Sequence, residues 1–381
     1  MCYTFASMRI LFSIISIVVF SFSGISQSTP VQSDPDATPK YSNEFLTIGA
    51  GAQALGMSNA FAASANDVYS GYWNPAGLLG VKKLELGLMH SEYFAGIAKY
   101  DFIGIARPID SLSSAGISVI RFGVDDIPNT TQLIDAQGNL NYDRITSFSA
   151  ADYAFIFSYA RKLKRTGFSF GANAKFIYRN IGDFASAFGF GLDASINYKF
   201  KKWRFSAVGK DITTTVNSWN TELDEETEEV FTATGNDIPG QSLEITLPRI
   251  VLGASRNWEV SKTVNVNTEL DLLITTDGKR NTVISSDPIS IAPMFGFDAG
   301  YKNVFFLRGG IGNFQEVTSI KPISPDEEIP ETPELRTAWT FQPNFGLGLK
   351  LKNISIDYAL TDIGNVSDAL YSNVFSVKVD F

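Results

Sequence analysis

Residues 188–200 read FGFGLDASINYKF, and this stretch decides the fold class. Every even-numbered position carries an apolar or aromatic side chain, and every odd-numbered position carries glycine or a polar side chain. A repeat of two residues is typical of a β-strand, whose successive side chains point to opposite faces. The run exceeds the average strand of about five or six residues and covers the roughly 9–11 residues that a tilted strand needs to cross a bilayer.

The same alternation recurs along the chain, for example in residues 168–178, 264–274, 295–301 and 345–351. Aromatic side chains often lie near the ends of these segments, as in the interfacial girdles of transmembrane barrels. About fourteen candidate strands result from this pattern. They lie near 84–90, 95–107, 114–122, 150–162, 167–180, 186–200, 202–210, 246–257, 263–274, 291–302, 303–312, 341–351, 353–361 and 371–381.

The lengths of the connections favour a closed barrel. Links from an even-numbered candidate strand to the next strand are short, whereas the long links, roughly 123–149, 211–245, 275–290 and 313–340, all follow odd-numbered strands. Outer-membrane barrels carry short periplasmic turns and longer extracellular loops. We therefore expect an all-β, transmembrane, antiparallel barrel of about 14 strands in the bacterial outer membrane. A soluble β-sandwich also alternates, but it has no reason to separate long loops from short ones.

The first residues are typical of an export signal. Arg9 precedes the apolar run 10–22, and small residues follow as far as Ser26, so we expect a signal peptide over 1–26. A buried N-terminal helix or strand is the alternative. Cys2, the single cysteine, lies in this segment, which leaves no thiol for disulfides, metal binding or catalysis in the remainder. No later apolar run is long enough for a transmembrane helix.

The charge and the acidic segments limit the classes of partner. The formal net charge is −9, which disfavours nucleic acid, because phosphate neutralisation needs a basic face. Two predicted loops are acidic, one with Glu225, Glu226, Glu228 and Glu229 and one with Asp326, Glu327 and Glu328. We interpret them first as solvated loops. Binding of a basic partner or of calcium is the alternative, although the ligand spacing of an EF-hand is absent.

Few residues point to catalysis. His90 is the only histidine, and its place at the outer end of the first candidate strand suits an interface or loop better than an active site. Without a placed nucleophile and base, we expect no enzymatic activity, no cofactor and no metal site. The polar faces of the strands are predicted to form a solvated, ion-paired lumen wall, or else a selective polar channel. These faces carry Lys175, Arg179, Asp193, Glu269, Asp271 and Asp298.

One segment before the first strand breaks the two-residue rhythm. Residues 45–78 are rich in alanine and glycine, and they contain the turn formers Asn66-Asp67 and Asn74-Pro75. Asn74 as N-cap and Pro75 at the first helical position predict a short helix. Since small residues allow tight packing inside a barrel, we expect an N-terminal extension and plug, or hatch, over 27–82 and the barrel over 83–381.

This segment resembles the N-terminal region of the PorV/PorQ family, whose members are FadL-like outer-membrane barrels. The resemblance rests on Gly-Met-Ser-Asn-Ala at 56–60, Ala-Asn-Asp at 65–67 and Trp-Asn-Pro-Ala-Gly at 73–77. It implies fourteen strands and a hatch whose motif residues here are Asn66, Asp67, Trp73, Asn74, Pro75, Ala76 and Gly77. Residues 49–54 depart from the Ser-Pro-Asp-Ala-Arg-like run of PorV itself, so a paralogue fits as well.

The resemblance implies a function in the type IX secretion system, in protein secretion or cell-surface attachment of cargo. Translocon components or secreted cargo proteins would be the partners, besides outer-membrane lipid. The alternative is a FadL-like transporter of hydrophobic small molecules, which would bind a hydrophobic ligand. Whichever of the two functions holds, the strand 371–381 is expected to close the barrel against the strand 84–90. Its apolar face, which resembles a terminal assembly signal, consists of Phe375, Val377, Val379 and Phe381.

Overall fold

A computed structural model describes residues 42–381, except 132, 134–138, 165–166, 224, 234, 236–239, 321–334 and 362–371. The expected signal peptide therefore lies outside the described residues. The strands are β1 (Glu85–Tyr93), β2 (Ala98–Pro108), β3 (Ser113–Asn129), β4 (Thr146–Lys162), β5 (Phe168–Ile181), β6 (Ala185–Phe200), β7 (Trp203–Lys210), β8 (Thr215–Thr221), β9 (Ser242–Thr246), β10 (Arg249–Glu259), β11 (Val264–Thr275), β12 (Ile284–Ser285), β13 (Ser290–Tyr301), β14 (Phe305–Ile320), β15 (Leu335–Leu351), β16 (Ile354–Thr361) and β17 (Ser372–Asp380).

The strands form one closed antiparallel sheet. β1 pairs with β2 on one side and with β17 on the other, so the sheet has no open edge there. β7 and β8 both pair with β6 and are two halves of the seventh wall strand, while β9 and β10 are two halves of the eighth. β12 only bridges to β13. The wall therefore has fourteen strands, and the expected fold class is confirmed.

The seventh and eighth wall strands are each interrupted. The prediction placed residues 211–245 in one loop and therefore missed β8 and most of β9. On β7 the buried side chains are even-numbered, such as Ser206 and Val208, whereas on β8 they are odd-numbered, such as Thr215 and Asn217. The interruption changes the phase of the alternation, and so the two-residue pattern breaks off at residue 210. Asp211 has a left-handed backbone, with φ 56°.

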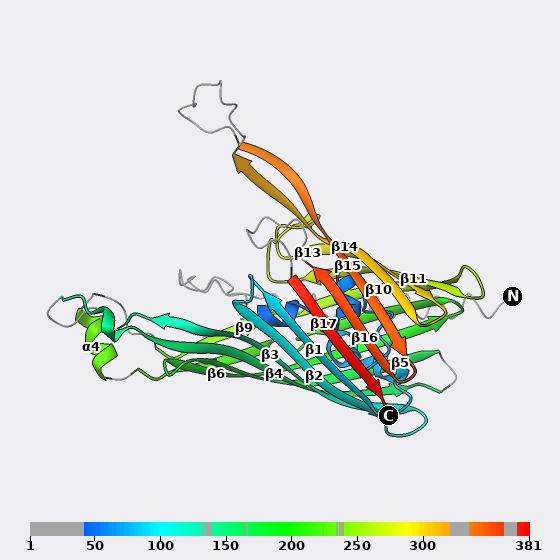
Figure 1. The fold of residues 1–381 in the computed structure, drawn as a ribbon, viewed down its shortest axis with the longest axis horizontal. Helices are drawn as coiled ribbons and strands as arrows, with labels where there is room; N and C mark the ends of the chain where they lie inside the picture. Colours follow the sequence, from blue (N-terminus) through cyan, green and yellow to red (C-terminus); the bar gives the residue numbers. More distant parts are fainter. Residues whose placement is uncertain are drawn as a thin grey trace, which may run out of the picture. The chain divides into compact units, whose positions relative to one another are not determined.

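The extracellular elements are longer than predicted. β14 and β15 continue past the wall as a hairpin, in which Gln315–Ile320 pair with Leu335–Thr340. A second hairpin, β8–β9, carries helix α4 (Glu225–Ala233), where a solvated loop was expected. Glutamate is a good helix former, which accounts for a helix in this acidic run. Figure 1 shows the β14–β15 hairpin and helix α4 reaching beyond the strands of the wall.

The other helices are short: η2 (Glu44–Thr47), α2 (Ala52–Gly56), α3 (Ser70–Trp73), η3 (Pro75–Gly80) and η4 (Tyr142–Arg144). Among the described residues, no helix has the length and apolar character needed to cross a membrane. The outward side chains of the wall strands are large, apolar and exposed, for example Ile103, Phe157 and Leu347. Such a band suits contact with lipid. The chain is an outer-membrane β-barrel. In such barrels the end with the short turns is the periplasmic one.

Candidate functional site

The hatch, which we define as residues 42–82, lies inside the barrel and contacts the wall on several sides. It begins beside β8 and β9, where the Asn217 amide donates to Asn43 Oδ1 at 2.9 Å. Helix α2 packs on β14–β17, and helix η3 packs on β2–β6. Figure 1 shows the hatch helices, in blue, among the wall strands. β1 begins at Glu85, close to the expected start of the barrel at residue 83, but the division of the preceding chain at residue 26 stays a prediction.

The Asn-Pro-Ala part of the predicted motif forms the expected helix start. Asn74 Oδ1 accepts a hydrogen bond from the Ala76 amide at 3.1 Å, and Pro75 takes the first position of η3, which is a 3₁₀-helix. The Asn74 amide group also donates to Asn197 Oδ1 of β6 at 2.7 Å. The Ala76 amide donates to Ser195 Oγ of the same strand at 3.0 Å. The motif therefore both caps a helix and attaches it to the wall.

The other motif residues have different surroundings. Asp67 is buried, and its Oδ2 accepts from the Lys378 ammonium of β17 at 3.1 Å, whereas Asn66 is exposed to a polar pocket. The Trp73 indole donates to the Ala50 carbonyl within the hatch at 2.7 Å. Gly77 lies so close to the hatch backbone that a Cβ atom there would be 2.4 Å from the Ala65 oxygen. A functional role for the motif as a unit stays a prediction.

Two neighbouring carboxylates of β11 bind the middle of the hatch. Asp271 Oδ2 accepts from the Phe61 and Ala62 amides at 2.9 and 2.8 Å. Glu269 accepts from the Ala63 amide at 2.6 Å and from the Ser64 amide at 3.1 Å. Both carboxylates are fully buried, with exposures of 1% or less. Four successive backbone amides are thus satisfied by two wall side chains, which attach the middle of the hatch to β11.

Glycines of the wall allow the hatch backbone to approach closely. A Cβ atom at Gly171 of β5 would be 2.2 Å from the Ala76 nitrogen. At Gly310 of β14 it would be 2.4 Å from the Met57 carbonyl carbon, and at Gly346 of β15 it would be 3.2 Å from the Gly56 Cα. These glycines lie on different sides of the lumen. The hatch is therefore fitted to the wall around its periphery.

The inner wall has two sectors. The apolar sector, formed by parts of β1–β4 and β17, presents buried apolar side chains to the aromatic rings of the hatch, and the charged Glu85 and Lys378 of β1 and β17 adjoin it. Its members are Met89, Tyr100, Phe102, Ile120, Ile156 and Val374. The polar sector, on β5, β6, β10, β11, β13, β14 and β16, carries the predicted lumen charges. Those charges are mostly buried, contrary to the expected solvated lumen wall, because the hatch occupies the space that water would fill.

A buried ion network in the polar sector lies at the interruption of the seventh strand. Lys175 pairs with Asp193 at 2.7 Å and also with Asp211, and Arg249 pairs with Asp211 at 3.0 Å. The Asp211 amide donates to Asp193 Oδ1 at 2.8 Å. These contacts hold the left-handed backbone of Asp211 in place. Arg179, another predicted lumen charge, pairs with Asp152 at 2.7 Å.

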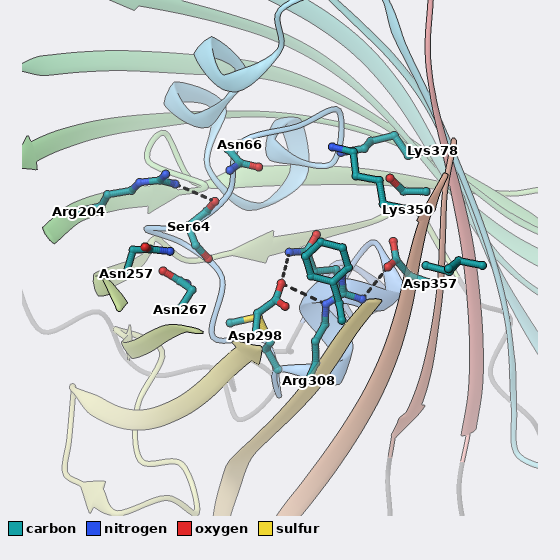
Figure 2. A pocket seen from close by; sticks show the side chains of 15 residues that line it. Ser64, Asn66, Arg204, Asn257, Asn267, Asp298, Arg308, Lys350, Asp357 and Lys378 are labelled. Carbon is teal, nitrogen blue, oxygen red and sulfur yellow. Dashed lines mark hydrogen bonds and ion pairs between the residues drawn. The ribbon is translucent and has the colours of Figure 1, made fainter. Parts of the chain in front are cut away.

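Figure 2 shows a polar pocket of about 260 Å³ on the periplasmic side of the hatch. Arg308 is bound there between Asp357 at 2.6 Å and Asp298 at 3.3 Å. Arg204 lies on one side of the pocket in this view, and Lys350 and Lys378 lie on the other. Its lining consists largely of charged and amide side chains, so transfer of an apolar solute from water to this pocket is barely favourable. The apolar sector suits such a solute better.

The closing strand is placed as predicted, although its role as an assembly signal stays a prediction. Phe375 lies opposite His90, Val377 opposite Leu88 and Val379 opposite Leu86 in the β1–β17 register. The Phe381 amide donates to the Leu84 carbonyl at 2.9 Å.

The residues proposed for partner binding are only partly described. On α4, Glu225, Glu228 and Glu229 are exposed, while Glu226 belongs to the same helix. Asp326, Glu327 and Glu328 lie outside the described residues. No group of three or more metal-ligating side chains occurs within the described part of the chain. The His90 Nδ1 atom is 2.7 Å from Asp101 Oδ1 on the outer face, with both side chains about half exposed.

The alternation placed Glu269, Asp271 and Lys378 on inward faces, but it gave no sign that they bind the hatch. The partners of the two β11 carboxylates are backbone amides, which carry no side-chain signal, and Lys378 is 311 residues from Asp67 in sequence. One signal was available: two carboxylates at alternate positions of one strand face the same side. That spacing indicates a shared partner inside the barrel.

No protein-family model and no curated protein matches this chain. Solved structures do resemble it. The monoaromatic hydrocarbon channel CymD superposes with a TM-score of 0.51 at 12% identity, over 88% of this chain and 98% of that chain. The toluene transporter TbuX of Ralstonia pickettii gives 0.50 at 11% identity, over 88% and 100%. The toluene transporter TodX of Pseudomonas putida gives 0.50 at 12% identity, over 87% and 98%. At such identities the likeness concerns the fold alone, and it agrees with the expected fourteen-stranded barrel.

Proposed function

We propose that this chain carries hydrophobic small molecules across the outer membrane, which was the alternative in the sequence analysis. The apolar sector of the inner wall carries the proposal. The interior of a transmembrane barrel is generally polar. Here Tyr100, Phe102 and Ile120 instead pack in one buried cluster with the aromatic hatch residues Tyr69 and Tyr72, and the Tyr69 and Phe102 ring centroids are 5.0 Å apart. Transfer of an apolar solute from water to such a surface is favourable by about 25 cal/mol of free energy per Å² of apolar area buried.

The comparisons support this solute class more than they support secretion. CymD is described as a monoaromatic hydrocarbon channel, and TbuX and TodX are described as toluene transporters. They share only the fold with this chain, so the same class of solute is an inference for this chain. The type IX secretion role and membership of the PorV/PorQ family find no support in these comparisons.

Uptake of radiolabelled toluene by host cells that lack such a channel tests the proposal. Cells with the wild-type chain should take up toluene faster than cells with an empty vector. Phe122→Lys should reduce this uptake by about tenfold, because a charge would enter the apolar sector, against which Phe122 packs. Lys164→Gln, in an exposed periplasmic turn, is the control and should leave uptake unchanged. Wild-type uptake equal to that of the empty vector would exclude toluene as a solute.

A role in protein secretion or surface attachment remains a second candidate because of the extracellular hairpins. Trp339 of the β14–β15 hairpin is 56% exposed, and such a side chain suits a protein partner. A deletion strain in which secreted proteins fail to reach the cell surface, with toluene uptake unchanged, would favour this candidate. Normal secretion in that strain would remove it.

A further inference from the structure

Arg256 lies between two indole rings on the outer face of the barrel. Its guanidinium carbon is 3.8 Å from the centroid of the Trp258 ring and 5.1 Å from that of the Trp203 ring. Arg256 is directly opposite Trp203 in the β7–β10 register, and Trp258 follows two positions later on β10. Side chains two positions apart share one face of a strand. The three side chains therefore form one cluster.

This cluster faces the membrane near its periplasmic boundary. Trp203 and Trp258 are 36% and 42% exposed, whereas Ser255, which points inward from β10, is 1% exposed. Phe205 extends the cluster along β7, with its ring stacked on Trp203 at 5.9 Å. Arg256 is three residues from the end of β10, beside the short turn between β6 and β7. Tryptophans at this level are typical of the headgroup region.

The charge of Arg256 has no counter-charge in the described part of the chain. No ion pair joins it to a described carboxylate, and its buried Nε–H has no hydrogen-bond acceptor there. Glu259, at the end of the same strand, pairs instead with Lys202 at 3.5 Å. The Trp258 indole donates to Thr268 Oγ1 at 3.0 Å, which orients that ring. A guanidinium does not lose its proton in proteins, so a full positive charge remains at the lipid boundary.

We propose that Trp203, Arg256 and Trp258 form a binding site for the phosphate of an anionic phospholipid in the periplasmic leaflet. The planar fork of arginine matches two phosphate oxygens, and the indole rings hold it in one orientation. The acyl chains would lie on the adjoining apolar wall, where Leu252 and Phe205 are about 40% exposed. This site does not depend on what passes through the lumen.

Native mass spectrometry of the full chain tests the site. The protein is released into detergent from nanodiscs that contain equal amounts of phosphatidylglycerol and phosphatidylcholine, and the retained lipids are counted. Wild type should retain phosphatidylglycerol in preference to phosphatidylcholine. Arg256→Gln should retain about tenfold less phosphatidylglycerol, because charge-assisted hydrogen bonds are lost. Arg256→Lys should be intermediate, since lysine keeps the charge without the planar fork.

Two further variants define the site. Trp258→Leu keeps Arg256 but removes one ring, and it should also lower retention. Arg161→Gln is the matched control, because Arg161 is an exposed, outward arginine at the end of β4 that contacts the Tyr159 hydroxyl at 3.3 Å instead of two rings. Its retention should equal that of wild type. Heat-modifiable mobility in gels verifies that each variant is folded.

Three results would overturn the proposal. Equal phosphatidylglycerol retention in wild type and Arg256→Gln would show that Arg256 binds no lipid. An equal loss in Arg161→Gln would show a general effect of charge at the periplasmic boundary. Displacement of the lipid by inorganic phosphate alone would assign the site to a soluble anion.

Discussion

The Lys378 ammonium donates a hydrogen bond to Asp67 Oδ2 at 3.1 Å, which joins the hatch to the last wall strand. Close by, the Val68 amide donates to Glu85 Oε2 of the first wall strand at 3.0 Å. The hatch therefore braces both strands of the seam at which the barrel closes. It is part of the closure as well as an obstruction of the lumen.

Replacement of Lys378 by methionine should destabilise the folded barrel. Asp67 would keep a buried charge without its partner, and loss of one member of a buried pair costs about 3 kcal/mol. Urea unfolding, followed by tryptophan fluorescence in detergent, measures the change. The double variant Asp67→Asn/Lys378→Met should recover much of the loss. Equal stability of the single and double variants would argue against a coupled pair.

Glu269→Gln should loosen the middle of the hatch. The Ala63 and Ser64 amides would exchange two charge-assisted hydrogen bonds for neutral ones. A difference of about 1.5 kcal/mol corresponds to roughly tenfold faster hydrogen exchange at these amides. Glu259→Gln, at an exposed ion pair at the end of the neighbouring strand β10, is the control. Unchanged exchange at the Ala63 and Ser64 amides would contradict the role of Glu269.

Gly171→Ala should displace helix η3 of the hatch. The added methyl group would be 2.2 Å from the Ala76 nitrogen, which is backbone and cannot move independently. Overpacking of this kind costs about 1–3 kcal/mol. The melting temperature should fall, and trypsin should cleave the hatch more readily. Gly240→Ala, where no atom lies within 4 Å of the added methyl, should behave like wild type.

Substitutions of Asn74 separate its two roles. Asn74→Ala removes both the cap and the wall contact, and it should cost about 1–2 kcal/mol of the free energy of unfolding. Asn74→Asp keeps an oxygen for the Ala76 amide but loses the donor to the Ala62 carbonyl and Asn197 Oδ1. It should therefore destabilise the chain through the wall contact. Equal stability of wild type and Asn74→Asp would show that only the cap matters.

Phe381→Asp should impair assembly of the barrel. Phe381 continues the apolar outer face of β17, and a charge on the lipid face opposes insertion. The amount of folded, heat-modifiable protein in the outer-membrane fraction measures the effect. Leu140→Asp, at an exposed extracellular residue, should leave that amount unchanged. Normal assembly of Phe381→Asp would contradict the predicted terminal signal.

The wall was largely predictable because each strand shows its two faces in its own sequence. Residues 188–200 indicate both the length of β6 and which side chains meet lipid. The prediction failed where interruptions shift the alternation, between β7 and β8 and between β9 and β10, and at α4, where a solvated loop was expected. The helix start at Asn74 was also predictable, since capping is a local interaction.

By itself, the sequence determined a fourteen-stranded barrel with an N-terminal hatch, because alternation, turns and caps depend on neighbours within a few residues. Only the tertiary structure decided what binds what inside it. Glu269 meets the Ala63 amide across 206 residues, and Lys378 meets Asp67 across 311. Backbone amides and distant charges leave no periodic signal. Arg256 also could not be told from other outward arginines by sequence, because its neighbour Trp203 is set by the register between β7 and β10.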